Sequence, residues 1–267
     1  MKIFLLKVIL RLPNRLLNSI IGILRLGKHE PNNNYYNCAP LLLCRSIKMT
    51  GLIQGDVISD SIATLGFFDW KKSLNIYSEA KRNAGLFVDV GANIGYFSLL
   101  WLGLNKGNRV ISVEASPPNI SIIKENIKIN NLDGRLNIFP VAASDHVGTV
   151  RFDVGPEEQT GWGGITTADG MKTIELEAVT LDKLLGNEEV IDLLKIDVEG
   201  AELLVLKGAE VLLKMKRIKK ILFETNLERM QLLGISGNAP VRYLEDHGYK
   251  CTRLLHDDAE WEASPAS

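Results

Sequence analysis

Short apolar runs alternate with longer amphipathic segments along most of the chain. The apolar runs predict buried strands at 86–89, 109–114, 136–141, 191–197, 219–225 and 249–255. The segments between them, with their capping residues and glycine stops, predict helices at 96–104, 116–130, 201–215 and 240–247. This alternation is typical of an α/β protein with a doubly wound, mostly parallel sheet, in which ligands bind at the carboxyl ends of the strands.

Two further segments depart from that alternation. Residues 149–154 and 173–179 alternate apolar with polar positions, as antiparallel strands do, and they flank a glycine-rich loop at 160–164. They predict a β-hairpin insertion, in which Trp162 is either part of a lid or part of a long hairpin loop. Farther upstream, the turn signals within 51–66 predict short strands.

The first 28 residues follow a third pattern and predict an N-terminal helical extension. Apolar clusters are interrupted by cations, and no acidic residue occurs before Glu30. Lys7, Arg11 and Arg15 recur every four residues, so they share one face of the predicted helix. The apolar runs are much shorter than the ~20 residues that span a bilayer. Two interpretations remain: a peripheral contact of residues 1–28 with an anionic membrane, or a helix packed on protein with its cations in water.

Composition narrows the class of protein. The chain has 31 Lys plus Arg and 32 Asp plus Glu, so its net charge of −1 gives no indication of nucleic acid as a partner. Its three cysteines form no CxxC pair, which argues against a disulfide framework and favours a reducing, cytoplasmic location. We expect a basic extension at 1–50, one folded domain at 51–256 and a tail at 257–267, where apolar alternation is absent.

A strand, a glycine turn and a helix start follow one another at 86–95, LFVDVGANIG. Free backbone N–H groups and the positive end of a helix dipole meet there, which predicts an anion-binding site. A dinucleotide site has the spacing G-x-G-x-x-G, but Asn93 stands where the middle glycine should be. Asn93 hinders the approach of a diphosphate and offers an amide to a carboxylate. Asp89 would oppose a pyrophosphate and could accept from an ammonium group.

The following strand ends in an acid as well. Glu114 lies at its carboxyl end, where a carboxylate can bind both hydroxyls of a ribose. Ammonium, carboxylate and ribose are together the polar groups of S-adenosylmethionine. The sequence therefore predicts S-adenosylmethionine as the cofactor.

Five motifs occur in order along the chain: VDVGANIGYFS, VEASP, AASDHVG, TLDKLL and LLKIDVEGAELLVLKGA. Together they resemble the motifs of the FkbM family of class I S-adenosylmethionine-dependent methyltransferases, and the resemblance runs roughly from residue 66 to residue 255. The resemblance implies a Rossmann-like methyltransferase domain and methyl transfer to a small acceptor, usually a hydroxyl. That fold normally ends in an antiparallel strand paired with the strand predicted at 249–255. The sequence after it lacks apolar alternation, which predicts that this strand is missing or very short.

The resemblance also implies roles for individual residues. Cofactor-binding positions carried over in this way are Asp89, Gly91, Asn93 and Gly95 in the turn, Glu114 at the ribose, and Ala143 and Asp145 beside the adenine. Asp197 and Glu199 fall on the loop that faces the transferable methyl group, and we expect them to be catalytic.

Methyl transfer to a hydroxyl requires a group that removes the hydroxyl proton. Candidates near the strand ends are Asp197, Glu199, Glu224, His146 and His256. Asp197 is the best placed, because it ends a strand. Asp197 with Glu224 or Asn226 could instead bind Mg²⁺, but no ligand string requires a metal and none is expected. Lys195, inside the same strand, is expected to pair with an acid such as Asp197 or Glu224.

The sequence thus predicts an S-adenosylmethionine-dependent methyltransferase that O-methylates a small molecule, a sugar or a glycan. Two alternatives belong to other classes of protein. An NAD(P)-dependent oxidoreductase is opposed by the absent G-x-G-x-x-G spacing. A catalytically inactive, membrane-docked interaction module would suit the basic N-terminal segment and the unusual C-terminal one.

Overall fold

A computed structural model gives the structure of the chain and describes residues 35–36, 38–156, 159–168, 172–254 and 259–266. The amphipathic segment 1–28 and His256 lie outside the described residues. No helix in the described ranges is long and apolar enough to cross a membrane.

Within the described residues, a seven-stranded sheet has the order β12-β13-β11-β10-β3-β4-β5. Its strands are β3 (Leu86–Val90), β4 (Arg109–Val113), β5 (Leu136–Phe139), β10 (Leu193–Ile196), β11 (Ile221–Glu224), β12 (Tyr249–Arg253) and β13 (Glu260–Pro265). Neighbours from β5 to β11 are parallel, and β13 is antiparallel to both β11 and β12. The predicted doubly wound, mostly parallel α/β sheet is confirmed.

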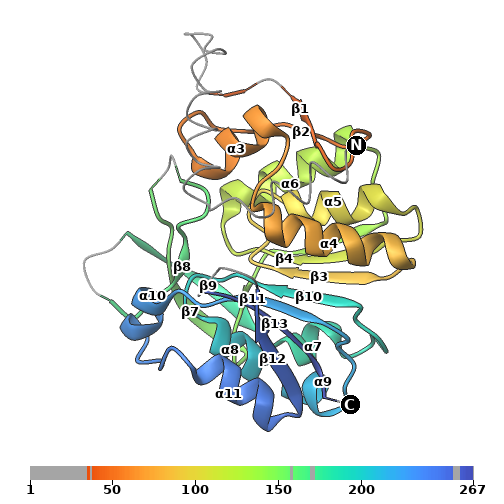
Figure 1. Ribbon diagram of the computed structural model, residues 1–267. Helices are drawn as coiled ribbons and strands as arrows, with labels where there is room; N and C mark the ends of the chain where they lie inside the picture. The colour runs from red at the N-terminus through yellow and green to blue at the C-terminus, as the bar shows by residue number, and fades with distance from the viewer. Residues whose placement is uncertain (1–34, 37, 157–158, 169–171, 255–258, 267) are drawn as a thin grey trace.

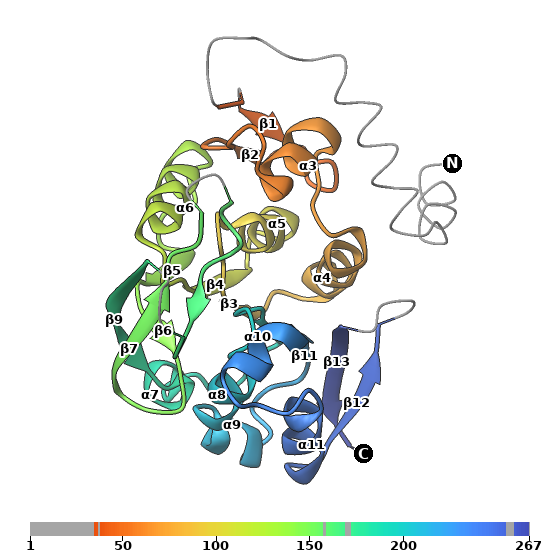
Figure 2. The same cartoon turned by 90° about the vertical axis from the view of Figure 1, so that its left-hand side faces the viewer.

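Helices cover both faces of this sheet (Figures 1 and 2). One face carries α4 (Trp70–Arg82), α5 (Tyr96–Leu104) and α6 (Pro117–Ile129), and the other carries α7 (Leu181–Leu185), α8 (Glu202–Lys207), α9 (Glu210–Lys214) and α11 (Ala239–Asp246). Consecutive side chains of a strand point to opposite faces, so Phe87 belongs to one apolar core and Val88 to the other.

The predicted hairpin insertion is present and forms a second, smaller sheet. Its order is β6-β9-β7-β8, with β6 (Ala142–Ala143), β7 (Gly148–Asp153), β8 (Gly164–Ile165) and β9 (Thr173–Val179). Strands β7 and β9 are antiparallel, as their alternation predicts. Figure 2 shows this sheet on the same side of the molecule as α10 (Leu227–Leu232).

The prediction of short strands within 51–66 is wrong, because this segment contains α3 (Val57–Leu65). Asp56 caps the helix by accepting from the backbone N–H of Ser59, and Gly66 ends it with a φ of +77°. The polar residues Ser59 and Ser61, which suggest a turn in the sequence, are buried in the helix.

Elements outside the expected domain 51–256 pack with it, and the prediction that the last strand is missing or very short is wrong. Before residue 51, β1 (Ala39–Pro40) pairs with β2 (Lys48–Met49), and Leu41 is fully buried in the same core as Phe87. At the other end, the expected tail 257–267 contains β13, which lies between β11 and β12. The strand escapes sequence patterns because its buried apolar position is Ala263 rather than a large side chain.

Candidate active site

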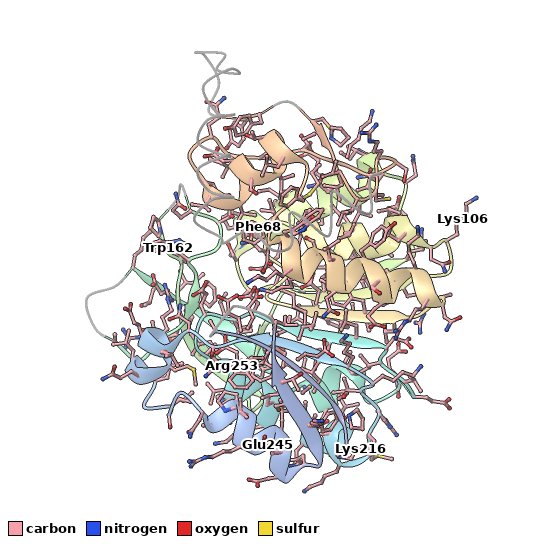
Figure 3. All side chains as sticks on the ribbon, viewed as in Figure 1. Phe68, Lys106, Trp162, Lys216, Glu245 and Arg253 are labelled. Atoms are coloured by element: carbon pink, nitrogen blue, oxygen red, sulfur yellow. The ribbon has the colours of Figure 1, made fainter. Side chains whose placement is uncertain are left out.

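A cavity opens at the carboxyl ends of the parallel strands, where a doubly wound sheet binds ligands. Its wall is formed by the segments after β3, β4, β5 and β10, by the end of β11, by the hairpin insertion, and by the first turns of α3 and α4. Figure 3 labels Phe68, which lines the cavity, and Trp162, which lies between the lining residues Gly161 and Gly163.

The glycine turn after β3 lies on this wall, and its backbone is unusual. Gly91 has a φ of +72°, and a Cβ atom there would lie 1.8 Å from the carbonyl oxygen of Asp197. Glycine is therefore needed for contact between two strand ends. Asn93 also has a positive φ of 51°. Gly95 caps α5 and lies against Ile123 of α6, so it does not line the cavity.

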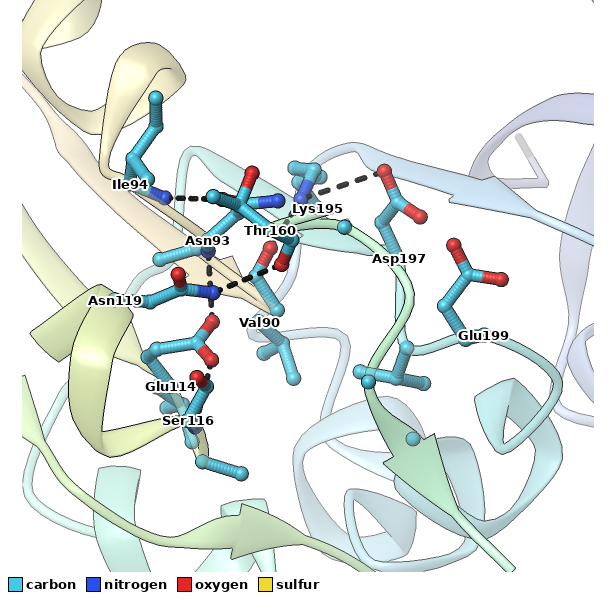
Figure 4. Close-up of a pocket in the computed structure, with 18 of the residues that line it drawn as sticks. Val90, Asn93, Ile94, Glu114, Ser116, Asn119, Thr160, Lys195, Asp197 and Glu199 are labelled. Atoms are coloured by element: carbon cyan, nitrogen blue, oxygen red, sulfur yellow. Dashed lines mark hydrogen bonds and ion pairs between the residues drawn. The ribbon is translucent and has the colours of Figure 1, made fainter. Parts of the chain in front are cut away.

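Glu114 joins this turn to the neighbouring strand (Figure 4). Its Oε2 accepts from the backbone N–H of Asn93 at 2.7 Å and its Oε1 from that of Ser116 at 2.8 Å. Burial raises the pKa of Glu114 to about 7, although these hydrogen bonds oppose the increase. A carboxylate has about four acceptor positions, so the Glu114 side chain can accept further hydrogen bonds beside these two.

Asp89 does not line the cavity. It is fully buried below the turn, accepts from Ser98 Oγ at 2.6 Å and pairs with Lys195 Nζ at 3.3 Å. Lys195 does line the cavity, donates to the carbonyl of Gly91 at 2.8 Å and lies 3.6 Å from Asp197, which confirms its predicted pairing with an acid. Because β3 and β10 are adjacent, Lys195 stands opposite Asp89 in the sheet.

Of the two residues predicted to lie beside the adenine, one lines the cavity and the other does not. Ala143 lines the cavity, whereas Asp145 lies outside its wall and bonds to the side chain of His146 at 2.8 Å. His146 is half exposed and does not line the cavity either.

The glycine-rich loop of the insertion closes one side of the cavity. The backbone N–H and the hydroxyl of Thr160 both donate to Asp56 at 3.1 Å, and Asn119 donates to the carbonyl of Thr160 at 3.0 Å. Gly161 and Gly163 line the cavity, but Trp162 is 57% exposed and does not. This loop is therefore fastened to α3 and α6.

At the end of the cavity away from Glu114, carboxylates gather around one lysine. Among the described residues, Lys72 Nζ has acidic partners on several elements: Asp69 at 3.1 Å, Asp197 at 3.3 Å, Glu224 at 3.1 Å and Glu260 at 3.3 Å. The Lys72 side chain is 3% exposed. Sequence reasoning missed Lys72 and Glu260. The spacing from the capping residue Asp69 marks Lys72 as a first-turn residue, but nothing in the sequence shows that it is buried.

The two predicted catalytic acids, Asp197 and Glu199, differ in pKa because of their neighbours. Burial alone would raise the pKa of Asp197, but the charges of Lys72 and Lys195 outweigh it and hold this pKa at about 2. Burial and the repulsion of Asp197 raise the pKa of Glu199 above its usual range. Glu199 is therefore the stronger base of the pair.

Glu199 is held in a defined orientation. Its backbone has a positive φ of 54°, and its Oε2 accepts from Asn226 Nδ2 at 2.7 Å. Val198 and Gly200, the chain neighbours of Glu199, donate their backbone N–H groups to Glu202 Oε1 at 3.2 and 3.1 Å. Burial raises the pKa of Glu202 to about 8.

The described residues contain no group of His, Cys, Asp and Glu arranged to hold a metal ion. The two carboxylates considered as magnesium ligands, Asp197 and Glu224, both contact the Lys72 ammonium.

A family model and several known proteins are similar to this chain. Residues 89–251 match the family model described as the methyltransferase FkbM domain. The methyltransferase sdnD of Sordaria araneosa is 29% identical over 205 residues, which cover 65% of this chain and 76% of that protein. Among solved structures, the SAH-bound methyltransferase PaMTH1 of Podospora anserina has 14% identity and a TM-score of 0.48, with 75% of this chain and 80% of that chain covered. An O-methyltransferase of Bacillus cereus in complex with SAH has 17% identity and a TM-score of 0.42, with 73% and 78% covered.

Proposed function

The chain belongs to the FkbM family of methyltransferases, and from that membership we propose that it methylates a hydroxyl group of a small molecule, a sugar or a glycan, with S-adenosylmethionine as the methyl donor. The observation that carries this proposal is the pairing, in one cavity, of a ribose-type carboxylate at one end with a cluster of carboxylates at the other.

The residues present fit S-adenosylmethionine. The Glu114 carboxylate lies at a strand end with lone pairs available for the ribose hydroxyls, and Gly91, Asn93 and Ala143 line the adjoining wall. Asp89 has no place in this contact, because Lys195 and Ser98 bind it below the turn. When bound, the cofactor supplies a methyl group already activated by a sulfonium.

The protein must then orient the acceptor and take its proton. We assign the proton to Glu199, whose raised pKa lies closer to neutrality than that of Asp197. Asn226 fixes the position of the Glu199 carboxylate. Asp197 is tied to the two lysines, so its role is to orient groups at this end of the cavity.

A thermal unfolding experiment tests the cofactor. A ligand at 100 times its dissociation constant stabilises a protein by about 2.7 kcal/mol. S-adenosylmethionine and S-adenosylhomocysteine should therefore raise the unfolding midpoint, and NAD should not. A shift with NAD alone would contradict the proposal.

A second experiment tests the acceptor. Incubation with methyl-labelled S-adenosylmethionine and a panel of sugars, amino sugars and phenols should transfer label to a hydroxyl oxygen, as located by NMR of the product. Label found on nitrogen or carbon would contradict O-methylation and leave methyl transfer standing.

We also propose that residues 1–28 contact an anionic membrane surface, on the basis of their cations and apolar clusters. Flotation with phosphatidylglycerol vesicles should retain the full chain and lose a chain that begins after residue 26. Equal behaviour of the two chains would end this proposal.

A further inference from the structure

The Lys72 ammonium contacts acidic residues from several elements, and the proposed function gives Lys72 no role. Its helix, α4, lies upstream of the residues that match the family model. The ammonium contacts an acid at the start of its own helix, one after β10, one at the end of β11 and one at the start of β13. It also lies 5.8 Å from the centre of the Phe97 ring, on the same ring that Lys195 approaches at 5.5 Å.

The Lys72 ammonium has fewer N–H donors than it has acidic neighbours. An ammonium carries three N–H donors, and four acidic side chains surround Lys72 Nζ among the described residues. Lys72 therefore finds acidic partners for its donors within the protein. The cavity-facing carboxylates, in contrast, keep lone pairs, and Glu224 is 40% exposed. Lys72 thus acts on the reaction through its neighbours.

We propose that Lys72 is a positioning residue for methyl transfer: its ammonium holds the Asp197 and Glu224 carboxylates in place, as anions, at the methyl end of the cavity. This inference rests on the proposed use of S-adenosylmethionine. Without the charge of Lys72, these neighbouring carboxylates would repel one another, and protonation would relieve the repulsion.

The pKa of Asp197 is lowered, as this role requires, and the charge of Lys72 lowers the pKa of Glu224 as well, although Asp197 and burial raise it above its usual value overall. Although burial opposes it, the surrounding carboxylates raise the pKa of Lys72 well above its usual value, so Lys72 stays charged and is no base. Burial and the charge of Asp69 raise the pKa of Glu260 to about 9, which leaves this acid neutral at pH 7. The groups that face the cluster from each packed element are Asp69 on α4, Tyr96 on α5, Asp89 on β3, Lys195, Asp197 and Glu199 on β10 and its loop, Glu224 on β11, and Glu260 on β13.

The test needs no knowledge of the acceptor. S-adenosylmethionine carries a sulfonium cation and S-adenosylhomocysteine a neutral thioether, so the ratio of their dissociation constants reports on the negative charge near the methyl group. We would measure this ratio by calorimetry between pH 5 and pH 9. In the wild-type chain, Asp197 stays ionised across this range, and the preference for S-adenosylmethionine should weaken toward the acid end as Glu224 protonates.

Lys72→Gln removes the charge but keeps hydrogen-bond donors. The midpoint of the pH dependence should move up by about one pH unit or more, since an opposite charge at this distance lowers a carboxyl pKa by ~1–3 units. Lys72→Arg should restore the wild-type midpoint. An unchanged midpoint in Lys72→Gln would overturn the inference.

Lys220 offers a matched control. It bridges Glu79 of α4 at 3.2 Å and Glu262 of β13 at 2.9 Å, so it ties together the same two elements as Lys72 without lining the cavity. Lys220→Gln should leave the midpoint unchanged. An equal shift in Lys220→Gln would reduce Lys72 to a structural tie and overturn the inference.

Two further points keep the outcomes distinct. If Lys72→Gln does not fold, the double variant Lys72→Gln/Glu260→Gln removes one acid together with the cation. Its midpoint is compared with that of Glu260→Gln alone and should be higher by the same amount. An equal midpoint in these two variants would overturn the inference. If the wild-type chain binds neither nucleoside, the proposed function fails. If it binds both and the midpoint does not move, only the role of Lys72 fails.

Discussion

Asn93 and Glu114 are joined by a hydrogen bond of 2.7 Å that runs from the backbone of the glycine turn to a buried carboxylate at the end of the next strand. The left-handed backbone of Asn93 turns its N–H toward this carboxylate. The turn and the ribose-type acid therefore form one unit, and a change to either should alter both.

Cofactor affinity should depend on the ionisation of Glu114. Hydroxyl donors bind a carboxylate better than a carboxylic acid. With a Glu114 pKa of about 7, affinity for S-adenosylhomocysteine should fall as the pH decreases below 7. Glu114→Gln replaces one of the two accepting oxygens with an NH2 group, which cannot accept a ribose hydroxyl, and should cost ~1–3 kcal/mol, or about 5- to 150-fold in affinity. Calorimetry across pH should show a flat profile for Glu114→Gln, and a slope like that of the wild-type chain would contradict this assignment.

Loss of the proposed base should separate turnover from binding. Glu199→Gln removes the proton acceptor and keeps the size of the side chain, so kcat should fall by ~10²–10⁴-fold. Affinity for S-adenosylhomocysteine should stay within about threefold, less than 1 kcal/mol. His146→Ala, outside the cavity wall, serves as the control and should leave kcat unchanged. Normal turnover in Glu199→Gln would exclude it as the base.

Glu202 should matter through the loop that it holds. Glu202→Ala would leave the N–H groups of Val198 and Gly200 without their acceptor, at ~1–3 kcal/mol each, and should lower both stability and kcat. Glu202→Gln keeps an acceptor and should resemble the wild-type chain at pH 7.

The pH dependence of stability offers a check on Glu202. Its folded pKa of about 8 lies above its ordinary value, so its contribution to the free energy of unfolding is present at low pH and is lost as the pH rises through 8. Urea unfolding at pH 6 and pH 9 should show a smaller decrease for Glu202→Gln than for the wild-type chain. Equal decreases would contradict a buried, neutral Glu202.

Gly91 should tolerate no side chain, for two reasons that can be separated. A left-handed backbone costs roughly 1–2 kcal/mol for any residue with a Cβ. Gly134 has a similar φ of +78° with nothing within 4 Å, so Gly134→Ala measures that cost alone. Gly91→Ala adds the clash with Asp197 and should destabilise the chain further and abolish binding of S-adenosylhomocysteine. Equal stability of the two variants would show that the strand ends can separate.

The parts of the site that the sequence predicts are local in the chain. The strand, the turn and α5 follow one another within twenty residues, so backbone preferences and apolar patterns locate Gly91 and Asn93. Glu114 is predicted because adjacent parallel strands end together. The fold is predicted for the same reason, from strand and helix patterns that each lie within one segment.

The remaining parts depend on tertiary contacts. Lys72 contacts Asp197 and Glu224 across 125 and 152 positions, and no local pattern records such pairs. Asp89 shows how tertiary contacts also change the surroundings of a residue that the sequence singles out. Its position before the turn suggests a ligand contact, but the lysine on the neighbouring strand binds it below the cavity surface.

The place of β13 has a consequence for the order of folding during synthesis. This strand follows every other strand of the described chain, yet it lies between β11 and β12. Until it emerges, β11 has an unpaired edge, and β12 has no neighbour in the sheet. A nascent chain can assemble the glycine turn and Glu114 early, but the cluster around Lys72 waits for Glu260. The half of the cavity around Glu114 can thus form before the half around Lys72.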